Sequence, residues 1–374
     1  MKVLSAVINN IESDQRLDKV CNSLLKFGFD VELIGTNLRG NPKLNKKFKT
    51  YIFPLKNQKS SKLYIEFNLK LFFILLKKVD KNTILLANDL DSLLPFYLVS
   101  KLKNRPLIYD SHEIFSELPS LTNRPKTKKF WKTLEKFIVP RLKHFYTVSD
   151  GYSEWFHKEY GIKPIVIKNV PKLQTLHNTQ DIFFKLPEKS PEEKIVIYQG
   201  VLNISRGIEK TIEAMQYVDN CQFWILGNGP KREELIALTQ KLNLEKRVHF
   251  LGNVKPIILR TITPLADVGI SLEEDLGISY RYALPNKLFD LIQAKVPILG
   301  TNLPEIKKVI TDNKIGKVIN NHDPKHIAEK IKELILEGKL PYLTNLTRAS
   351  KEYCWENEEQ KLKKIYKPFL DKKI

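Results

Sequence analysis

Short apolar runs alternate with longer amphipathic segments along this chain, and this alternation restricts the possible folds more than any other feature. The first run covers residues 2–8, an amphipathic segment follows at residues 15–27, and a second run covers residues 31–35. Gly28 follows the amphipathic segment, at a position where glycine commonly ends a helix. A strand, a helix and a strand with short connections predict a parallel sheet with helices on its faces.

The same alternation begins again in the second half of the chain. Residues 171–193 contain three prolines and show no regular apolar spacing, which predicts a linker. A chain of 374 residues is long enough for two domains with separate cores. We therefore expect an α/β protein in which two doubly wound domains are followed by an amphipathic helix. The expected bounds are residues 1–170 for the first domain, 194–352 for the second and 353–374 for the final helix.

The composition is typical of a water-soluble globular protein, with 42% hydrophobic and 28% charged residues. No apolar run approaches the roughly 20 residues that span a bilayer, and the run near the start is too short for a typical signal peptide. The cysteines, Cys21, Cys221 and Cys354, are too few and too far apart to predict a disulfide framework or a zinc cluster. We expect a cytoplasmic protein.

The net charge of +20 is concentrated in the first half of the chain. Residues 1–170 hold 30 lysines and arginines against 16 aspartates and glutamates. Such an excess suits nucleic acid, anionic lipid or a phosphorylated substrate. Lysine outnumbers arginine 51 to 11, whereas sequence-specific DNA readers rely on the bidentate base contacts of arginine. Nucleic acid is therefore the least favoured of the three partners.

Two segments of the first half combine lysines with aromatic residues. They cover residues 56–81, an apolar helix flanked by lysines, and residues 123–143, where Phe130 and Trp131 lie among cations. Basic amphipathic segments with aromatic residues suit the surface of an anionic membrane. Ordinary surface helices with an inward apolar stripe explain the same pattern, and RNA binding is a third interpretation.

Polar residues follow two further apolar runs of the first half. The run at residues 83–87 is followed by Asn88 and Asp89, and the run at residues 106–109 by Asp110. In a doubly wound sheet the carboxyl ends of the strands face the ligand crevice. We therefore expect one edge of the sheet to gather Asp14, Arg16, Asp89, Asp110, His112 and Glu113.

Each of these residues also has a structural explanation. Asp89 or Asp110 can cap the helix that follows, and a lone histidine such as His112 is more often structural than functional. The loop after the first run contains no glycine, so the G-x-G-x-x-G fingerprint of dinucleotide-binding proteins is absent. A nicotinamide or flavin cofactor is therefore not expected at this end of the chain.

Residues 281–300 predict a loop, a helix and a buried strand at residues 296–299. Asn286 and Lys287 lie at the helix start, with Asp290 one turn further. Unpaired amides at a helix N-terminus attract phosphate, Lys287 adds a cation, and the Asp290 carboxylate is placed to reach a ribose diol. This pattern predicts a nucleotide diphosphate site, with a surface ion pair between Lys287 and Asp290 as the alternative.

A second cation is expected at the same phosphates. Arg206 follows the strand candidate at residues 194–199, at a turn with Gly200 and Gly207 on either side. Such a strand-to-helix turn is expected to place the guanidinium on the phosphates held by Lys287. A helix-surface arginine is the alternative.

Taken in order, the motifs of the chain resemble those of the family-4 glycosyltransferases of GT-B fold. In the second half the matching stretches are QG…RG at residues 199–207, LGNGP, ADVGISL and LPNKLFDLIQAKVPILGT. In the first half they are SDQR, YDSHE, LEKFIVPRLKHFYTVS and VIKNVP. The resemblance covers nearly the whole chain, and its PNKLF(D/E) block is typical of one branch of the family.

The resemblance implies two Rossmann-like domains that face a cleft, with the nucleotide-sugar donor held mainly by the second domain. It also implies a final helix that crosses back to the first domain, and a retaining transfer that needs no bound metal and no other cofactor. The implied catalytic residues are His112, close to the reacting sugar, and the cations Arg206 and Lys287 on the donor diphosphate. The implied donor-binding residues are Gly200, Arg206, Gly227, Asn286, Lys287, Leu288 and Asp290, and the implied acceptor-binding residues are Asp14, Arg16, Asp89 and Glu113.

Three positions depart from the family pattern and leave the sugar and base of the donor open. Tyr282 stands where a glutamate is common, Val201 replaces the usual arginine, and Asp290 is one methylene shorter than the usual glutamate. The expected protein is a cytoplasmic glycosyltransferase, peripheral to the membrane, that adds a sugar to a lipid-linked glycan in bacterial surface polysaccharide synthesis. Two alternatives stay open: a nucleotide-sugar 2-epimerase of the same fold, and an inactive transferase-like subunit that scaffolds a partner.

Overall fold

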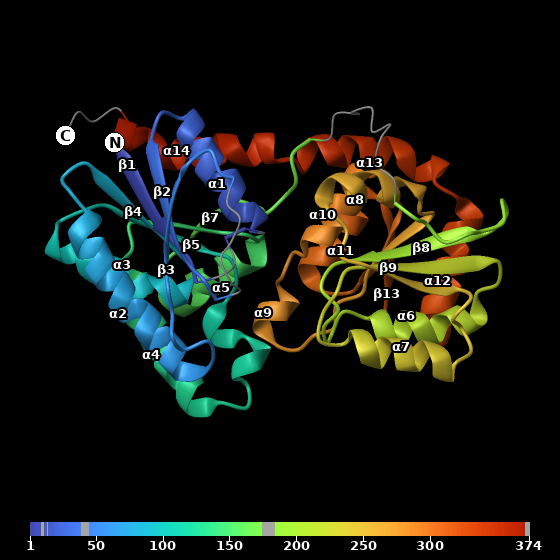
Figure 1. Ribbon diagram of the computed structural model, residues 1–374. Helices are drawn as coiled ribbons and strands as arrows, with labels where there is room; N and C mark the ends of the chain where they lie inside the picture. Colours follow the sequence, from blue (N-terminus) through green and yellow to red (C-terminus); the bar gives the residue numbers. More distant parts are fainter. Residues whose placement is uncertain (9–10, 13, 39–44, 174–183, 371–374) are drawn as a thin grey trace. The chain divides into compact units, whose positions relative to one another are not determined.

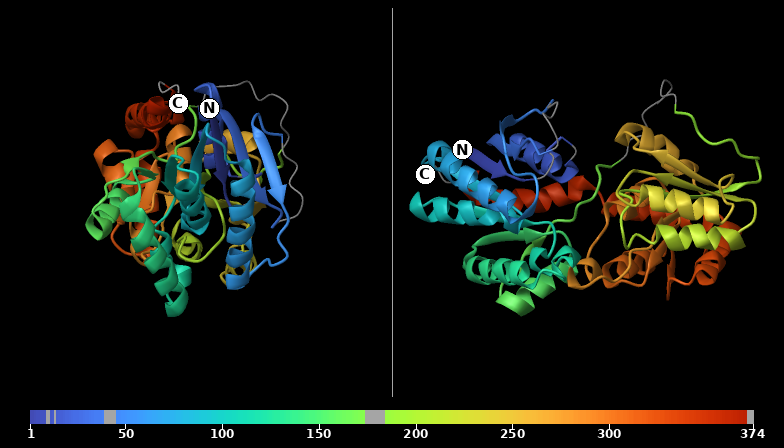
Figure 2. Two further views of the ribbon diagram at one scale, coloured as in Figure 1. Left: turned by 90° about the vertical axis from the view of Figure 1, so that its left-hand side faces the viewer. Right: turned by 60° about the horizontal axis from the view of Figure 1, so that its bottom comes forward.

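The computed structural model describes all residues except 9–10, 13, 39–44, 174–183 and 371–374. The chain forms two compact units, the first made of Met1–Asn169 with Glu356–Ile374 and the second of Val170–Trp355. Each unit is an α/β domain in which helices cover a parallel sheet (Figure 1, Figure 2). The motif SDQR includes residue 13, and the predicted linker includes residues 174–183, so those parts lie outside the described residues.

The first unit has a seven-stranded sheet of order β3-β2-β1-β4-β5-β6-β7. Its central strand β1 pairs in parallel with β2 and β4, and places Val3 beside Val31 and Ile84. The order of the strands reverses at β1, as in doubly wound folds. Its strands are β1 (Lys2–Ala6), β2 (Asp30–Thr36), β3 (Lys49–Phe53), β4 (Thr83–Asn88), β5 (Leu107–Ser111), β6 (His144–Thr147) and β7 (Ile165–Val166).

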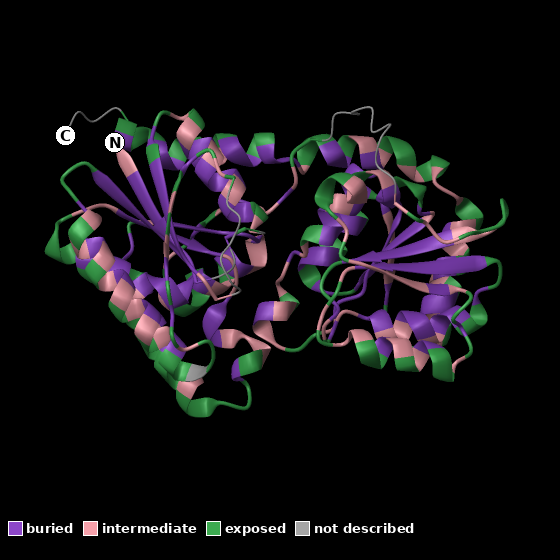
Figure 3. Ribbon diagram, in the orientation of Figure 1, coloured by how far each residue is buried: buried purple, intermediate pink, exposed green. Residues whose placement is uncertain are grey.

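Helices pack on both faces of this sheet because its inner strands are buried on both sides (Figure 3). The last helix of the chain returns to this unit, where the Glu359 carboxylate accepts hydrogen bonds from Ser23 and Lys26, the latter at 2.6 Å. The helices of the unit are α1 (Gln15–Lys26), α2 (Ser60–Lys78), α3 (Leu90–Leu102), α4 (Pro125–Ile138), α5 (Asp150–Tyr160) and α14 (Trp355–Leu370), with the short turn η1 (Phe115–Glu117) before α4.

The second unit has a six-stranded sheet of order β10-β9-β8-β11-β12-β13. Successive residues of β8 point to opposite faces, so Val196 and Tyr198 join one apolar core while Ile195 and Ile197 join the other. Its strands are β8 (Lys194–Gln199), β9 (Cys221–Leu226), β10 (Val248–Gly252), β11 (Val268–Ser271), β12 (Ile298–Thr301) and β13 (Gly316–Ile319).

The helices of the second unit alternate with its strands. Phe184 and Leu186, which fall in the predicted linker, pack against one of its apolar cores. The helices are α6 (Ile208–Ala214), α7 (Arg232–Lys241), α8 (Pro256–Ile262), α9 (Ile278–Arg281), α10 (Asn286–Gln293), α11 (Pro304–Asn313), α12 (Pro324–Glu337) and α13 (Leu340–Glu352). The predicted strand at residues 296–299 begins two residues late, at Ile298, because Lys295 occupies a left-handed turn at φ 60°.

Candidate active site

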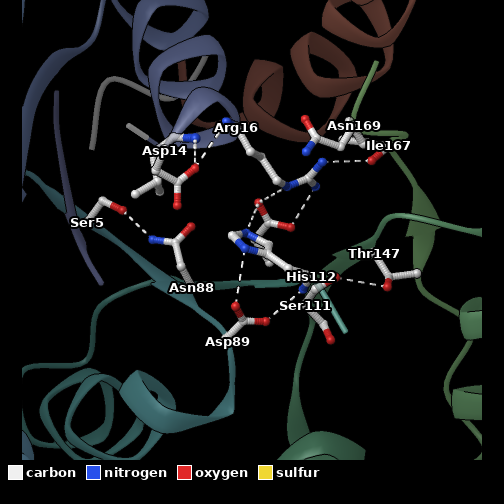
Figure 4. A network of polar contacts seen from close by, with 12 residues as sticks. Ser5, Asp14, Arg16, Asn88, Asp89, Ser111, His112, Thr147, Ile167 and Asn169 are labelled. Atoms are coloured by element: carbon white, nitrogen blue, oxygen red, sulfur yellow. Dashed lines mark hydrogen bonds and ion pairs between the residues drawn. The ribbon is translucent and has the colours of Figure 1, made fainter. Parts of the chain in front are cut away.

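The first unit gathers charged side chains where β4 and β5 end, as the sequence predicts (Figure 4). Asn88 of β4 lies beside Asp110 of β5 in the parallel register, so the residues that follow them emerge together. Asp89 follows β4 directly, and His112 follows β5. The carboxyl edge of this sheet therefore carries a cluster of opposite charges, which we call the first-unit site: Arg16, Asp89, Asp110, His112 and Glu113.

His112 lies between two carboxylates. Its Nδ1 is 3.2 Å from Asp89 Oδ2 and its Nε2 is 3.2 Å from Asp110 Oδ2. Its backbone N–H also donates to Asp89 Oδ1 at 2.8 Å. Burial alone would lower the pKa of His112, but the charges of Asp89 and Asp110 outweigh it and the pKa lies well above its ordinary value. The two carboxylates therefore favour the charged, imidazolium form of His112.

Arg16 holds the other side of Asp110 in a bidentate ion pair. Its Nε donates to Asp110 Oδ2 at 3.0 Å, its Nη2 to Asp110 Oδ1 at 2.7 Å, and its Nη1 to the Ile167 carbonyl at 3.0 Å. Both side chains are buried. Burial alone would raise the pKa of Asp110, but Arg16 and His112 keep it below its ordinary value. The Arg16 guanidinium is thus held by Asp110 and the Ile167 carbonyl, and its contact with an acceptor stays a prediction.

Asp14 and Asp89 each precede a helix, but only Asp14 caps the helix with its side chain. Asp14 caps α1, because its carboxylate accepts from the backbone N–H groups of Arg16 at 3.1 Å and Leu17 at 3.0 Å. Asp89 also occupies a cap position, before α3, but its side chain makes no capping hydrogen bond and pairs with His112 instead. Its backbone has φ 56°, an unusual value for a residue other than glycine. The capping explanation is therefore wrong for Asp89.

Two carboxyl groups near Asp89 in the first unit have raised pKa values: Glu113, within the first-unit site, and Asp91, which follows Asp89 by two residues. Burial and then the charge of Asp89 raise the pKa of Glu113 to about 7, although His112 opposes them. Asp91, which the sequence did not single out, is buried, and burial followed by Asp89 raises its pKa well above the ordinary range. Among the described residues its Oδ1 has no hydrogen-bond partner. The charge of Asp89 thus favours the neutral form of both Asp91 and Glu113, and Glu113 titrates near neutrality.

The second unit brings the two predicted cations together at a third, unpredicted residue. Lys287, in the first turn of α10, contacts Glu273 Oε1 through its Nζ at 2.6 Å. Arg206 Nη1 is 3.9 Å from the same oxygen. The other oxygen of Glu273 accepts from Ser271 Oγ at 2.7 Å. We call this cluster, Arg206, Glu273 and Lys287, the second-unit site.

Lys287 and Glu273 are both buried, so their charges depend on each other. Burial lowers the pKa of Lys287, and Glu273 only partly restores it. Burial would raise the pKa of Glu273, but Lys287 keeps it below its ordinary value. The surface ion pair considered for Lys287 and Asp290 is therefore wrong, because the lysine is buried against Glu273. Two cations and one carboxylate leave this position with an excess of positive charge.

The glycines and an aromatic ring shape the space around Lys287. The ammonium lies 4.2 Å from the centre of the Tyr198 ring. A Cβ on Gly200 would lie 3.3 Å from the Tyr198 hydroxyl and 3.8 Å from Lys287 Cε. A Cβ on Gly227 would lie only 1.8 Å from the Gly200 carbonyl oxygen, so that close approach of two strand ends requires glycine. Both predicted glycines therefore act through the backbone.

The remaining predicted donor residues lie on α10 itself. Asn286 is exposed and Asp290 is half-buried, both on the first turns of the helix. Leu288 is fully buried in an apolar core, and its amide donates to the Pro285 carbonyl at 3.1 Å. The Leu288 side chain is therefore part of the core and not available to a ligand. Arg206 lies in the loop before α6, with its guanidinium 5.5 Å from the centre of the Tyr280 ring, and is not a helix-surface residue.

Two doubly wound units, each with a charged cluster at the carboxyl edge of its parallel sheet, define the class of proteins with a GT-B fold. The family model "Glycosyltransferase Family 4" matches residues 15–195, and the model "Glycosyl transferases group 1" matches residues 178–352. The two models together match residues 15–352, so each half of the chain is similar to a family of glycosyltransferases, and the fold is that of the GT-B glycosyltransferases.

Curated relatives agree with this assignment over parts of the chain. An uncharacterized glycosyltransferase of Methanocaldococcus jannaschii is 26% identical over 47% of this chain and 45% of its own length. The chitobiosyldiphosphodolichol beta-mannosyltransferase of Kluyveromyces lactis is 24% identical over 54% of this chain and 44% of its own length. The chain thus spans about half the length of the curated relatives it matches.

Solved structures match the chain over nearly its full length. The sucrose-phosphate synthase of Thermosynechococcus elongatus has a TM-score of 0.81 at 13% identity and covers 99% of both chains. The HepE protein of Anabaena, solved with UDP and glucose, has a TM-score of 0.73 at 15% identity and covers 98% of this chain and 99% of its own. Likeness at such low identity shows the fold alone.

Proposed function

We propose that this protein is a retaining glycosyltransferase that moves a sugar from a nucleoside diphosphate donor to a lipid-linked glycan acceptor. The observation that carries the proposal is the convergence of Lys287 and Arg206 on one oxygen of Glu273. A structural neighbour is named as a complex with UDP and glucose, which supports a nucleotide-sugar donor. The retaining outcome and the absence of a metal rest on the family resemblance.

The second-unit site would bind the donor diphosphate. Negative charge develops on the leaving diphosphate as the glycosidic bond breaks, and fixed cations stabilise that charge. Lys287 and Arg206 would supply the cations, and the N-terminus of α10 would add its backbone amides. Glu273 holds both cations in position. The phosphates of the donor would therefore compete with the Glu273 carboxylate for Lys287 and Arg206.

The first-unit site would bind the acceptor. His112 is kept cationic by Asp89 and Asp110, so it would act as a fixed charge and not as a proton acceptor. Glu113, with a pKa of about 7, is the group suited to accept a proton from an acceptor hydroxyl at neutral pH. Asp110 and Arg16 would hold the orientation of His112 from behind.

A lipid-linked acceptor is supported by the charge of the chain and by its relatives. The name of the Kluyveromyces lactis relative denotes an acceptor on dolichol diphosphate, and that of another relative, from Rhizobium meliloti, denotes lipopolysaccharide core synthesis. The positive excess of residues 1–170 suits an anionic membrane at which such acceptors reside. The association that we propose is peripheral. No helix in the described part of the chain is long and apolar enough to cross a membrane.

A thermal-shift screen of nucleotide sugars tests the donor half of this proposal. A ligand that binds the folded state raises its melting temperature, by an amount that grows with concentration above Kd. We expect one family of nucleoside diphosphate sugars to raise Tm, and the matching free nucleoside to leave it unchanged. A screen of UDP, GDP, dTDP and ADP sugars with no shift at millimolar concentration would contradict the proposed function.

A further inference from the structure

An apolar groove runs along the first unit between α2 and α4, which lie beside each other (Figure 1). Its volume of about 460 Å³ lies within the range of small-molecule sites, roughly 300–1,000 Å³. Most of its lining residues belong to α2 and α4, and Leu94 of α3 also lines it. We call it the α2–α4 groove and define it by Tyr64, Ile65, Leu69, Leu94, Phe130 and Trp131.

The walls of this groove expose large apolar side chains to solvent. Ile65 is 59% exposed, Leu69 57% and Phe130 57%. The opposite face of α2 is also apolar, because Phe67 and Leu71 are fully buried in the core. The inward stripe expected of an ordinary surface helix is present, but α2 also has a second, exposed apolar face that such a helix lacks. A contiguous exposed apolar patch on a soluble protein marks a binding surface.

Cations gather where both helices begin. Lys62 lies in the first turn of α2, Lys126 lies in the first turn of α4 and lines the groove, and Lys129 follows one turn later. Among the described residues none of these three lysines forms an ion pair, whereas Lys70, Lys128 and Lys132 on the same helices all pair with glutamates. An apolar channel with free cations at one end is complementary to an amphiphile with an anionic head.

Aromatic and polar contacts link the lining of the groove to residues next to the first-unit site. The Trp131 ring packs edge-on against Tyr64 at 5.4 Å and against Phe115 at 5.0 Å, and Phe115 lies two residues beyond Glu113. Asn68, on the groove side of α2, donates to the Asp91 carbonyl at 2.9 Å. Burial raises the pKa of Tyr64, and the nearby charges of Asp91 and Glu113 raise it further. A chain in the groove would therefore have its head beside the proposed acceptor residues.

We propose that the α2–α4 groove binds the hydrocarbon chain of a single-chain phosphate lipid, the carrier of the acceptor glycan. The lipid phosphate lies against Lys62 and Lys126, and the attached glycan extends to Glu113 and His112. This assignment rests on the proposed function and names the class of acceptor that the site takes.

Farnesyl phosphate, a short isoprenyl phosphate, is a suitable probe when used below its micelle concentration. Titration of the full chain by calorimetry, with Trp131 fluorescence as a second readout, should show saturable binding. Inorganic phosphate and farnesol, which supply the head and the chain separately, should each bind at least about tenfold more weakly, since each lacks one set of contacts.

Ile65→Asn and Leu69→Asn each place a polar group on a groove wall. Both positions are exposed, so the fold should be retained, which a melting curve verifies. Each should weaken farnesyl phosphate binding about tenfold or more. The matched control is Leu336→Asn, at a residue 89% exposed on α12 in the second unit, which should bind the probe like the wild type.

The assignment would be overturned by wild-type protein that shows no saturable binding of farnesyl phosphate, or by groove variants that bind it as tightly as Leu336→Asn does. Binding to phosphatidylglycerol vesicles without binding of the soluble probe would also overturn it, in favour of contact with the bulk membrane surface. UDP titrations of the same samples keep the two proposals apart. If the protein binds UDP but not farnesyl phosphate, only the assignment of the groove is wrong. If it binds farnesyl phosphate but no nucleotide, the donor proposal is wrong.

Discussion

The two charged clusters of this protein differ in how completely their charges are balanced. In the first-unit site, Arg16 and His112 are matched by Asp110 and Asp89 in contacts of 2.7–3.2 Å. In the second-unit site, two cations face the single carboxylate of Glu273. A balanced, buried network is a rigid framework, whereas an excess of cations at a strand edge attracts an anionic ligand. The same architecture thus holds a balanced network of charges in the first unit and an excess of cations in the second.

The largest expected effect is on stability, from breaking the balanced network. Arg16→Met would leave Asp110 buried without its main cation, which should lower the free energy of unfolding by about 3–5 kcal/mol. Urea denaturation of the full chain measures this loss. Lys49→Met, which breaks the exposed pair with Asp30, is the matched control and should cost less than about 1 kcal/mol. Equal stability of the two variants would mean that Arg16 is not part of the framework.

The next effect is on catalysis, at the unbalanced site. Lys287→Ala should lower kcat by about 100-fold or more, because it removes a cation from the developing charge of the leaving diphosphate. Lys330→Ala, at a surface lysine paired with Glu333, should leave turnover unchanged. Since Lys287→Ala also strips Glu273 of its partner, the double variant Lys287→Ala with Glu273→Gln tests whether a stable protein is still slow. Near-native turnover in that double variant would remove Lys287 from the mechanism.

A smaller effect is the pH dependence of stability that Glu113 causes in the first-unit site. The pKa of Glu113 is raised from 4.5 to about 7, so the folded state binds this proton more tightly than the unfolded state. Its contribution should therefore be full below about pH 4.5 and decline as pH rises to about 7, with no further change above. Glu113→Gln should flatten that part of the curve of unfolding free energy against pH. An unchanged slope in the variant would show that Glu113 does not titrate there.

The smallest effect concerns Asp14. Its carboxylate caps α1, and this structural role accounts for the residue without a ligand. Asp14→Ala should cost about 1 kcal/mol of stability, and Asp14→Ser, which keeps a capping oxygen, much less. Turnover of a purified, folded Asp14→Ser should equal that of the wild type. A loss of turnover in Asp14→Ser would instead support the acceptor contact that the family resemblance implies.

The sequence predicted most of the fold because buried parallel strands have a strong signal. Runs such as residues 2–8 and 83–87 are mostly apolar, and they form β1 and β4 at the centre of the first sheet. The strands that it did not predict, β3 and β13, lie at sheet edges and are only partly buried. Their sequences, KTYIF and GKVI, mix charged and apolar residues because one side of each strand meets solvent.

The candidate sites were predicted less completely because side-chain partners are far apart in sequence. Arg16 and Asp110 are 94 residues apart, so nothing in the local pattern indicated that the arginine is consumed by a buried ion pair. Glu273 was missed because it lies in the acidic stretch Glu273-Glu274-Asp275, which reads as a solvated loop. The signal that identified Asp89 was present there too, since Glu273 follows the end of β11 by two residues.

Whether the second-unit site binds the donor diphosphate is tested most directly by calorimetry that compares the binding of nucleoside diphosphates with that of nucleosides. UDP and GDP are titrated against uridine and guanosine, with wild-type protein and with Lys287→Ala carrying Glu273→Gln. We expect the wild type to bind one of the two diphosphates at least about 100-fold more tightly than the matching nucleoside. We expect the double variant to lose most of this preference. A wild type that binds neither diphosphate, or a double variant that keeps the full preference, would contradict this role of the second-unit site.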